Sequence, residues 1–117
     1  MDGFGDYVRT ARERLVEMGE RYSLRQVAMR IGIEPAYLSK VERGLVPPPS
    51  EATIARLAAD LGEDADVLLA MAGKVSSELQ GIIRRQPRAF AELIRELKDA
   101  PAGAILRIVR EVKEGSW

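Results

Sequence analysis

The groups with the most evident chemistry in this chain are the cations of a short strip between Arg21 and Arg43. Five basic residues lie there against two acids, Glu34 and Glu42, so five minus two leaves +3 on the strip, whereas the whole chain balances 18 bases with 18 acids. Guanidinium and ammonium groups bind phosphate oxygens, and through them nucleic acids. A charge run alone is also typical of a solvated face, so the surrounding elements must decide. The basic residues of the strip are Arg21, Arg25, Arg30, Lys40 and Arg43.

Two of the side chains that most often support catalysis or metal binding are missing. The chain has no histidine and no cysteine, which excludes disulfides and thiolate chemistry and removes the usual zinc ligands and the usual general base at neutral pH. The sequence also contains no glycine-rich phosphate loop and no cluster of acids at metal-ligand spacing. Six scattered aromatic residues, two Phe, three Tyr and one Trp, argue against RNA binding by base stacking. We therefore expect a protein that is not an enzyme and needs no cofactor.

The hydropathy pattern indicates a cytoplasmic protein. The longest apolar run, Val67 to Gly73, is far shorter than the roughly 20 residues that a membrane span needs. The N-terminus lacks the basic segment followed by an apolar core that marks a signal peptide.

Two short helices are predicted within the basic strip. Ser23 and Gln26 have the spacing of a capping box, which starts a helix, and Gly32 ends it because glycine adopts the left-handed conformation at little steric cost. Pro35 starts the next helix, since its missing N–H falls in the first turn, where no partner exists, and Gly44 closes that helix. A helix, a glycine turn and a second helix form a helix-turn-helix, which can place its second helix in the major groove of DNA. The predicted inner faces contain Val27, Ala28, Ile31, Leu38 and Val41.

Three further helices complete the first part of the chain, and no strand pattern competes with them. Helix four is capped by Ser50, and helix five is capped by Asp64 and ended by Gly73. We interpret Met18, Met29 and Met71 as core residues. The apolar stripes are Phe4, Val8, Ala11, Leu15 and Met18 in the first helix, Ile54, Leu57, Ala58 and Leu61 in the fourth, and Val67, Leu68 and Met71 in the fifth.

These segments resemble a known family. The run SLRQVAMRIGIEPAYLSKVERG, followed by PPPSEATIARLAADLG and DADVLLAMAG, is similar to the five-helix, lambda-repressor-like DNA-binding domain of Cro/C1-type helix-turn-helix regulators, the XRE family. The resemblance covers residues 4 to 73 and implies a DNA-binding domain over residues 1–73. Two positions depart from the family pattern. Leu24 stands where a glutamine is common, and Glu34 replaces the usual Ser or Thr cap of the recognition helix, so the operator sequence cannot be taken from a relative.

The resemblance also implies roles for individual residues. Lys40 can donate to guanine O6 and N7, and Ala36 can lie against a thymine methyl group. Glu42 is assigned to bracing the domain, because an acid facing phosphate would be repelled. The base-reading positions fall on Pro35, Ala36, Tyr37, Ser39 and Lys40. The phosphate-contacting positions fall on Ser23, Arg25 and Arg43.

Some of these residues have an equally simple structural interpretation. Tyr37 can pack against the first helix instead of contacting a base. Arg21 and Arg30 can serve as surface charges that keep the protein soluble, and for Arg30 we favour that role.

Residues 74–117 are predicted to form a C-terminal region of about three amphipathic helices. Pro87 and Pro101 start the last two, and the short connector between these two makes them antiparallel neighbours. Their apolar stripes exceed what a small monomer can bury, so we expect a homodimer. The alternatives are that the helices dock a second protein, as in an antitoxin or a partner-inactivated repressor, or pack on the DNA-binding domain. The residues expected at the dimer contact are Phe90, Leu93, Ile94, Leu97, Ile105, Ile108, Val109 and Val112.

The sequence as a whole thus predicts an all-α regulator with a five-helix domain followed by a helical dimerisation region. We expect sequence-specific binding to double-stranded DNA, as a repressor on an inverted repeat, through a recognition helix at about residues 34–43.

Overall fold

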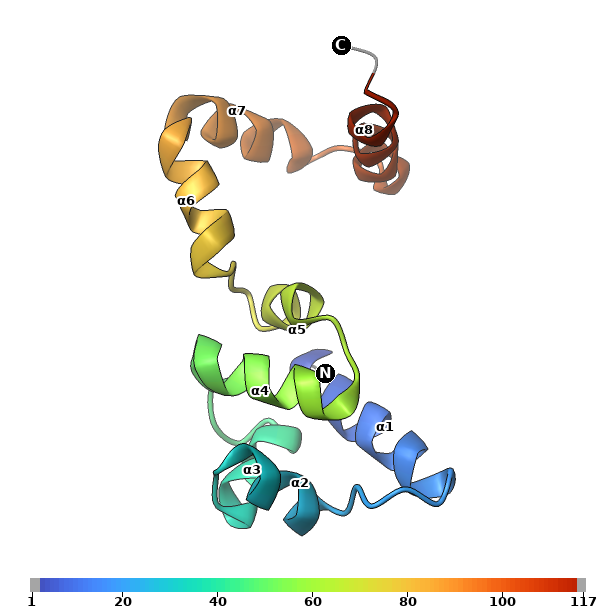
Figure 1. Cartoon of the computed structure of the whole chain (residues 1–117). Coiled ribbons are helices and arrows are strands. Elements are labelled where there is room, and N and C mark those ends of the chain that lie inside the picture. Colours follow the sequence, from blue (N-terminus) through green and yellow to red (C-terminus); the bar gives the residue numbers. More distant parts are fainter. Residues whose placement is uncertain (1–2, 116–117) are drawn as a thin grey trace. The chain divides into compact units, whose positions relative to one another are not determined.

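The structure, a computed structural model, describes residues 3–115 and is all-α over that range, as predicted. Eight helices and no strand are found among these residues (Figure 1). The chain divides into two compact units, an N-terminal unit that ends at Ser76 and a C-terminal unit that begins at Ser77. No helix of the described residues is long and apolar enough to cross a membrane.

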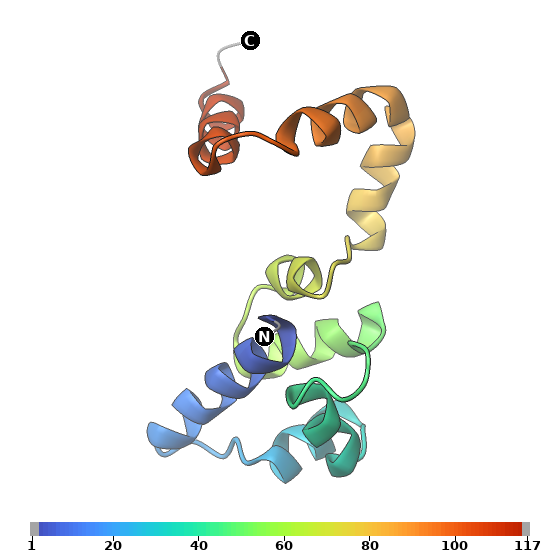
Figure 2. The ribbon, with the colours of Figure 1, turned by 180° about the vertical axis from the view of Figure 1, so that it is seen from behind.

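The N-terminal unit contains five helices in the predicted order. Helix α4 lies at its centre and contacts α1, α2 and α5, while α3 packs against α1 and α2 (Figures 1 and 2). This arrangement buries one face of every helix in a common core. The helices are α1 (Gly3–Glu17), α2 (Leu24–Ile31), α3 (Pro35–Glu42), α4 (Glu51–Leu61) and α5 (Ala65–Met71).

The predicted helix boundaries of the central pair are confirmed by their caps. The Ser23 hydroxyl accepts a hydrogen bond from the Gln26 N–H, and the Gln26 side chain accepts one from the Ser23 N–H, which completes the capping box. Gly32 ends α2 with φ +77°, in the left-handed region that favours glycine. Pro35 occupies the first turn of α3.

Most of the predicted core is buried, but four residues assigned to it are exposed: Met18, Met29, Val67 and Met71. Met18 lies beyond the end of α1 and is 75% exposed, and Met29 lies on the outer side of α2 and is 70% exposed. In α5 the buried face consists of Leu68 and Leu69, so Val67 points outward. Because Val67, Leu68 and Leu69 are consecutive, the helical period does not show which side of α5 meets its neighbours. The buried core is Phe4, Val8, Val27, Ala28, Ile31, Leu38, Val41, Ile54, Leu57, Ala58, Leu61, Leu68 and Leu69.

Helix α1 approaches the end of α3 more closely than any side chain would allow. A Cβ atom built on the buried Gly5 would lie 2.6 Å from the carbonyl oxygens of both Val41 and Glu42. Ordinary carbon contacts are about 3.5–4.0 Å. The absence of a side chain at Gly5 therefore sets the distance at which the recognition helix rests on α1.

The C-terminal unit contains α6 (Ser77–Arg85), α7 (Pro87–Leu97) and α8 (Ala102–Glu114). Proline occupies the first turn of α7 as predicted. Helices α6 and α7 pack against one another, but α8 does not pack along α7. The prediction that α7 and α8 are antiparallel neighbours is therefore wrong, because a short connector limits the distance between two helices without fixing their angle. None of the residues in these three helices is buried.

Candidate nucleic-acid interface

Helix α3 presents one buried face and one accessible face. Leu38, Val41 and Glu42 point into the unit and are at most 4% exposed. The accessible side carries the residues predicted to read bases: Ala36 and Lys40 are exposed, and Pro35, Tyr37 and Ser39 are half-buried. Because the turn at Gly32 separates α3 from α2, this side is not covered by the preceding helix.

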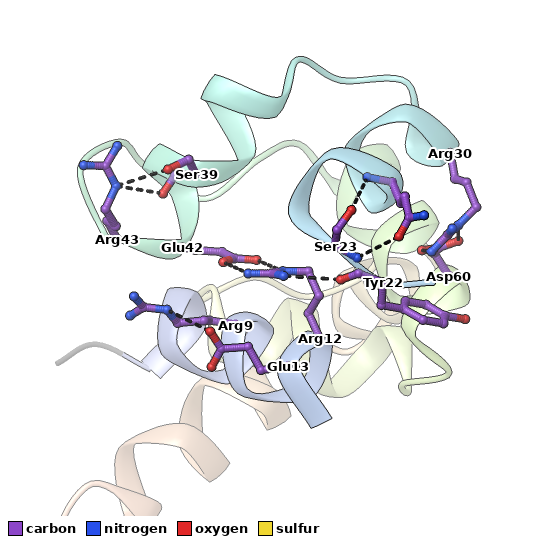
Figure 3. A network of polar contacts seen from close by, with 11 residues as sticks. Arg9, Arg12, Glu13, Tyr22, Ser23, Arg30, Ser39, Glu42, Arg43 and Asp60 are labelled. Atoms are coloured by element: carbon purple, nitrogen blue, oxygen red, sulfur yellow. Dashed lines mark hydrogen bonds and ion pairs between the residues drawn. The ribbon is translucent and has the colours of Figure 1, made fainter. Parts of the chain in front are cut away.

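A buried ion pair holds the end of α3 to α1. Arg12 Nε donates to Glu42 Oε2 and Arg12 Nη2 to Glu42 Oε1, both at 2.8 Å, and Arg12 Nη1 donates to the carbonyl oxygen of Tyr22 at 3.3 Å (Figure 3). The hydrogen bonds to Glu42 raise the pKa of Arg12 above its usual value. The bracing role predicted for Glu42 is confirmed. Its partner Arg12 was not predicted, although it follows Val8 by four residues on the buried stripe of α1.

A second ion pair fastens α2 to α4. Arg30 Nε donates to Asp60 Oδ1 at 2.7 Å and Arg30 Nη2 to Asp60 Oδ2 at 3.0 Å (Figure 3). Arg30 Nη1 donates to the carbonyl oxygen of Arg21 at 2.8 Å. The guanidinium carbon lies 4.6 Å from the centre of the Tyr22 ring, within the range of a cation–π contact. The hydrogen bonds to Asp60 raise the pKa of Arg30. The assignment of Arg30 as a solubility charge is therefore wrong, because it is a structural contact between helices.

The carbonyl end of α2 is held by a third arginine. Arg56 Nε donates to the carbonyl oxygen of Ile31 at 3.0 Å, and Arg56 Nη2 donates to Thr53 Oγ1 at 3.3 Å. The Ile31 carbonyl is one of the orphan acceptors that every helix end leaves. Arg56 thus stabilises the turn between α2 and α3 from the side of α4.

The remaining cations near α3 are accessible. Arg25 on α2 and Lys40 on α3 are exposed, and neither forms an ion pair within the part of the chain that the structure describes. Arg43, the residue after α3, is also exposed; its Nε donates to Ser39 Oγ at 3.2 Å and to the Ser39 carbonyl oxygen at 3.4 Å (Figure 3). Ser23 is exposed at the start of α2. All three residues predicted to contact phosphate are therefore at the surface.

Glu34 and Tyr37 lie at the start of α3. Glu34 occupies the cap position with extended backbone angles, but its side chain makes no capping hydrogen bond. This agrees with the weak cap expected for glutamate. Tyr37 is half-buried and packs against the core, so it has a structural contact and is still partly accessible.

Comparison with known protein families matches residues 4–71 to the helix-turn-helix domain. The chain belongs to this family. The N-terminal unit is a DNA-binding helix-turn-helix domain, and the resemblance inferred from the sequence is confirmed. The protein is accordingly a DNA-binding regulator. In helix-turn-helix domains the second helix of the motif, here α3, lies in the major groove.

Other comparisons add one structural likeness. The chain is similar to a chain in a solved SinR protein/SinI protein complex, with 26% sequence identity, covering 83% of this chain and 99% of that one, at a TM-score of 0.48. No curated protein matches the chain.

Three residues that hold α2 and α3 in place were not predicted from the sequence. The partners Arg12, Asp60 and Arg56 lie on α1 and α4, at least 25 residues from the atoms that they contact in α2 or α3. A charged residue on an otherwise apolar stripe was the available signal for Arg12. No comparable signal marks Asp60 or Arg56, because neither interrupts the apolar stripe of α4.

Proposed function

We propose that this chain is a sequence-specific regulator of transcription that represses by binding double-stranded DNA as a homodimer on an inverted-repeat operator. In this proposal residues 1–73 bind DNA and residues 74–117 associate with a second copy. No cofactor takes part.

The DNA-binding part of this proposal is supported by a difference between two groups of cations. Arg12, Arg30 and Arg56 are all engaged by atoms of their own chain and fix the helices. Arg25 on α2 and Lys40 on α3 are exposed, without an ion pair among the described residues. A positively charged and otherwise uncommitted surface on a fixed helix is suited to the polyanionic groove of DNA.

The proposed roles follow the geometry of the two helices. Lys40 donates to guanine in the major groove, and Ala36 contacts a thymine methyl group. Arg25 and Arg43 bind phosphates on either side, and Ser23 brings the start of α2, the positive end of that helix, to a third phosphate. The proposed base-facing residues are Pro35, Ala36, Tyr37, Ser39 and Lys40.

The homodimer is supported by the apolar surface of the C-terminal unit. Ile94 is 63% exposed on α7, and Ile105 and Val112 are each 52% exposed on α8. An apolar pocket of about 430 Å³ is lined by Ile83, Phe90 and Ile94 together with Pro87 and Ala91. Exposed apolar patches of this kind mark protein contacts. The proposed contact residues are Phe90, Leu93, Ile94, Leu97, Ile105, Ile108, Val109 and Val112.

Selection of bound duplexes from a random DNA pool tests this function. We expect enrichment of an inverted repeat whose half-sites are centred about 34–36 Å apart, or a multiple of that distance, because a two-fold dimer presents two copies of α3. Lys40→Ala provides the control, since it should lose discrimination at one base position of each half-site. A pool that stays random after repeated rounds would refute sequence-specific binding.

A second candidate function is favoured by the same apolar surface. The C-terminal helices can dock a different protein, as in an antitoxin or a repressor that a partner inactivates. Sedimentation equilibrium of the full chain separates the two proposals. A dimer at micromolar concentration supports self-association, whereas a monomer with full affinity for a single half-site supports docking of another protein.

A further inference from the structure

The serine and the arginine at the end of the recognition helix form one unit. Ser39 is half-buried on α3, and its hydroxyl oxygen accepts a hydrogen bond from Arg43 Nε at 3.2 Å, one helical turn further on (Figure 3). The Ser39 carbonyl oxygen accepts a longer bond from the same Nε at 3.4 Å. Both contacts use the inner nitrogen of the guanidinium.

Arg43 differs in this respect from the three arginines that hold the helices of the N-terminal unit together. Arg12 and Arg30 use all three guanidinium nitrogens, and Arg56 uses Nε and Nη2. Neither terminal nitrogen of Arg43 has a hydrogen-bond partner among the described residues. Its outer edge, which has the fork geometry that binds a phosphate through two parallel bonds, is therefore left open.

We propose that Ser39 is a positioning residue, whose hydroxyl holds Arg43 so that the open edge of the guanidinium faces a DNA phosphate. This inference rests on the proposed function and changes one role within it: Ser39 acts through Arg43 and does not read a base. An exposed arginine loses much side-chain entropy when it is immobilised at an interface. The hydrogen bond to Ser39 restricts the side chain before DNA arrives, so less freedom is lost on binding.

The role predicts a pattern that differs from base reading. Ser39→Ala should weaken binding about threefold to tenfold, the effect of one ordinary hydrogen bond, and it should do so equally at every operator variant. A residue that reads a base would instead lose affinity at one base position. Ser39→Thr keeps a hydroxyl on the same carbon and should bind within about twofold of wild type.

A double-mutant cycle on the selected operator tests the proposal. Full-length wild type, Ser39→Ala, Arg43→Ala and the double variant are titrated with operator duplex at several salt concentrations, and circular dichroism checks that each is folded. We expect Arg43→Ala to lower the salt slope by about one and to abolish the effect of Ser39→Ala. Arg43→Lys keeps the charge but has no Nε–H. In this background too, Ser39→Ala should have no further effect on the affinity for the operator.

Three results would overturn this role while leaving DNA binding intact. The first is additive losses in the cycle, and the second is a loss from Ser39→Ala confined to one base position. Equal losses in Ser39→Ala and Ser39→Thr would likewise exclude the hydroxyl as the cause. If wild type selects no operator at all, the proposed function itself fails, so the two failures are distinguishable.

Discussion

Removing Arg12 should leave a buried, unpaired carboxylate and destabilise the N-terminal unit strongly. The side chains of Arg12 and Glu42 are only 10% and 3% exposed, and two hydrogen bonds of 2.8 Å join them. Breaking a buried pair by deleting one partner costs about 3–5 kcal/mol. A domain of this size has a total stability of about 5–15 kcal/mol. Arg12→Met should therefore reduce the free energy of unfolding by a large fraction, as measured by urea denaturation followed by circular dichroism.

A surface pair on the same helix provides the matched control. Arg9 Nε and Glu13 Oε2 lie 3.8 Å apart, with side chains 47% and 57% exposed, and exposed pairs contribute about 0–1 kcal/mol. Arg9→Met should thus change the free energy of unfolding by less than about 1 kcal/mol. Replacing both buried partners, as Arg12→Met with Glu42→Leu, should recover part of the loss, because the stranded charge is gone.

The pH dependence of this pair follows from the raised pKa of Arg12. A raised pKa means that the stability contributed by the charged arginine is fully present below its ordinary pKa and is lost only as the pH rises through the higher value in the folded protein. The titration of Arg12 should therefore not change the free energy of unfolding between pH 6 and pH 9.

Two results of the substitution experiment would refute the reasoning about the buried pair. One is a loss below 1 kcal/mol for Arg12→Met, and the other is a double variant no more stable than Arg12→Met alone.

Three other predictions test the packing, a surface hydrogen bond and the C-terminal face. Gly5→Ala should destabilise by about 1–3 kcal/mol, because its Cβ would clash with two backbone oxygens at 2.6 Å; Gly81→Ala, which has open space around it, should show no loss in the same urea titration. The Tyr7 hydroxyl donates a hydrogen bond to Glu63, and this bond raises the pKa of Tyr7. The protonated tyrosine therefore stabilises the fold below its ordinary pKa, and this contribution is lost as the pH rises through the higher pKa of the folded protein. The melting temperature should therefore fall more between pH 9 and pH 11 in wild type than in Tyr7→Phe, and equal falls would contradict this. Ile94→Glu places a charge on an apolar side chain that is 63% exposed; it should convert a dimer to monomers in sedimentation equilibrium, and an unchanged mass would remove α7 from the interface.

The helices around the proposed DNA surface could be predicted because their signals are local. The capping box at Ser23, the left-handed turn at Gly32 and the proline at the start of α3 each act within a few residues, and all three occur in the structure as expected. The inner faces of α2 and α3 follow from the helical period alone. The family resemblance rests on the same residues, and it is confirmed over residues 4–71.

The contacts that hold these helices together were not predictable in the same way. The pairs Arg12–Glu42 and Arg30–Asp60 each span 30 residues, and no local pattern indicates which of several charged residues will meet. The exposure of Met29 likewise depends on where the neighbouring helices lie. In the C-terminal unit the stripes of α7 and α8 predicted helices correctly but did not predict how they pack, because neither stripe is buried within the chain.

The central claim is that α3 reads DNA sequence, and Lys40 tests it most directly. Lys40 is exposed on α3 and has no ion pair among the described residues. Equilibrium binding of wild type and Lys40→Ala should be compared across operators that differ at one base pair at a time. We expect Lys40→Ala to lose about 1–3 kcal/mol at operators with the preferred base and to become indifferent to that one position. An equal loss at every operator would show that Lys40 contacts only the backbone, and it would contradict base reading by α3.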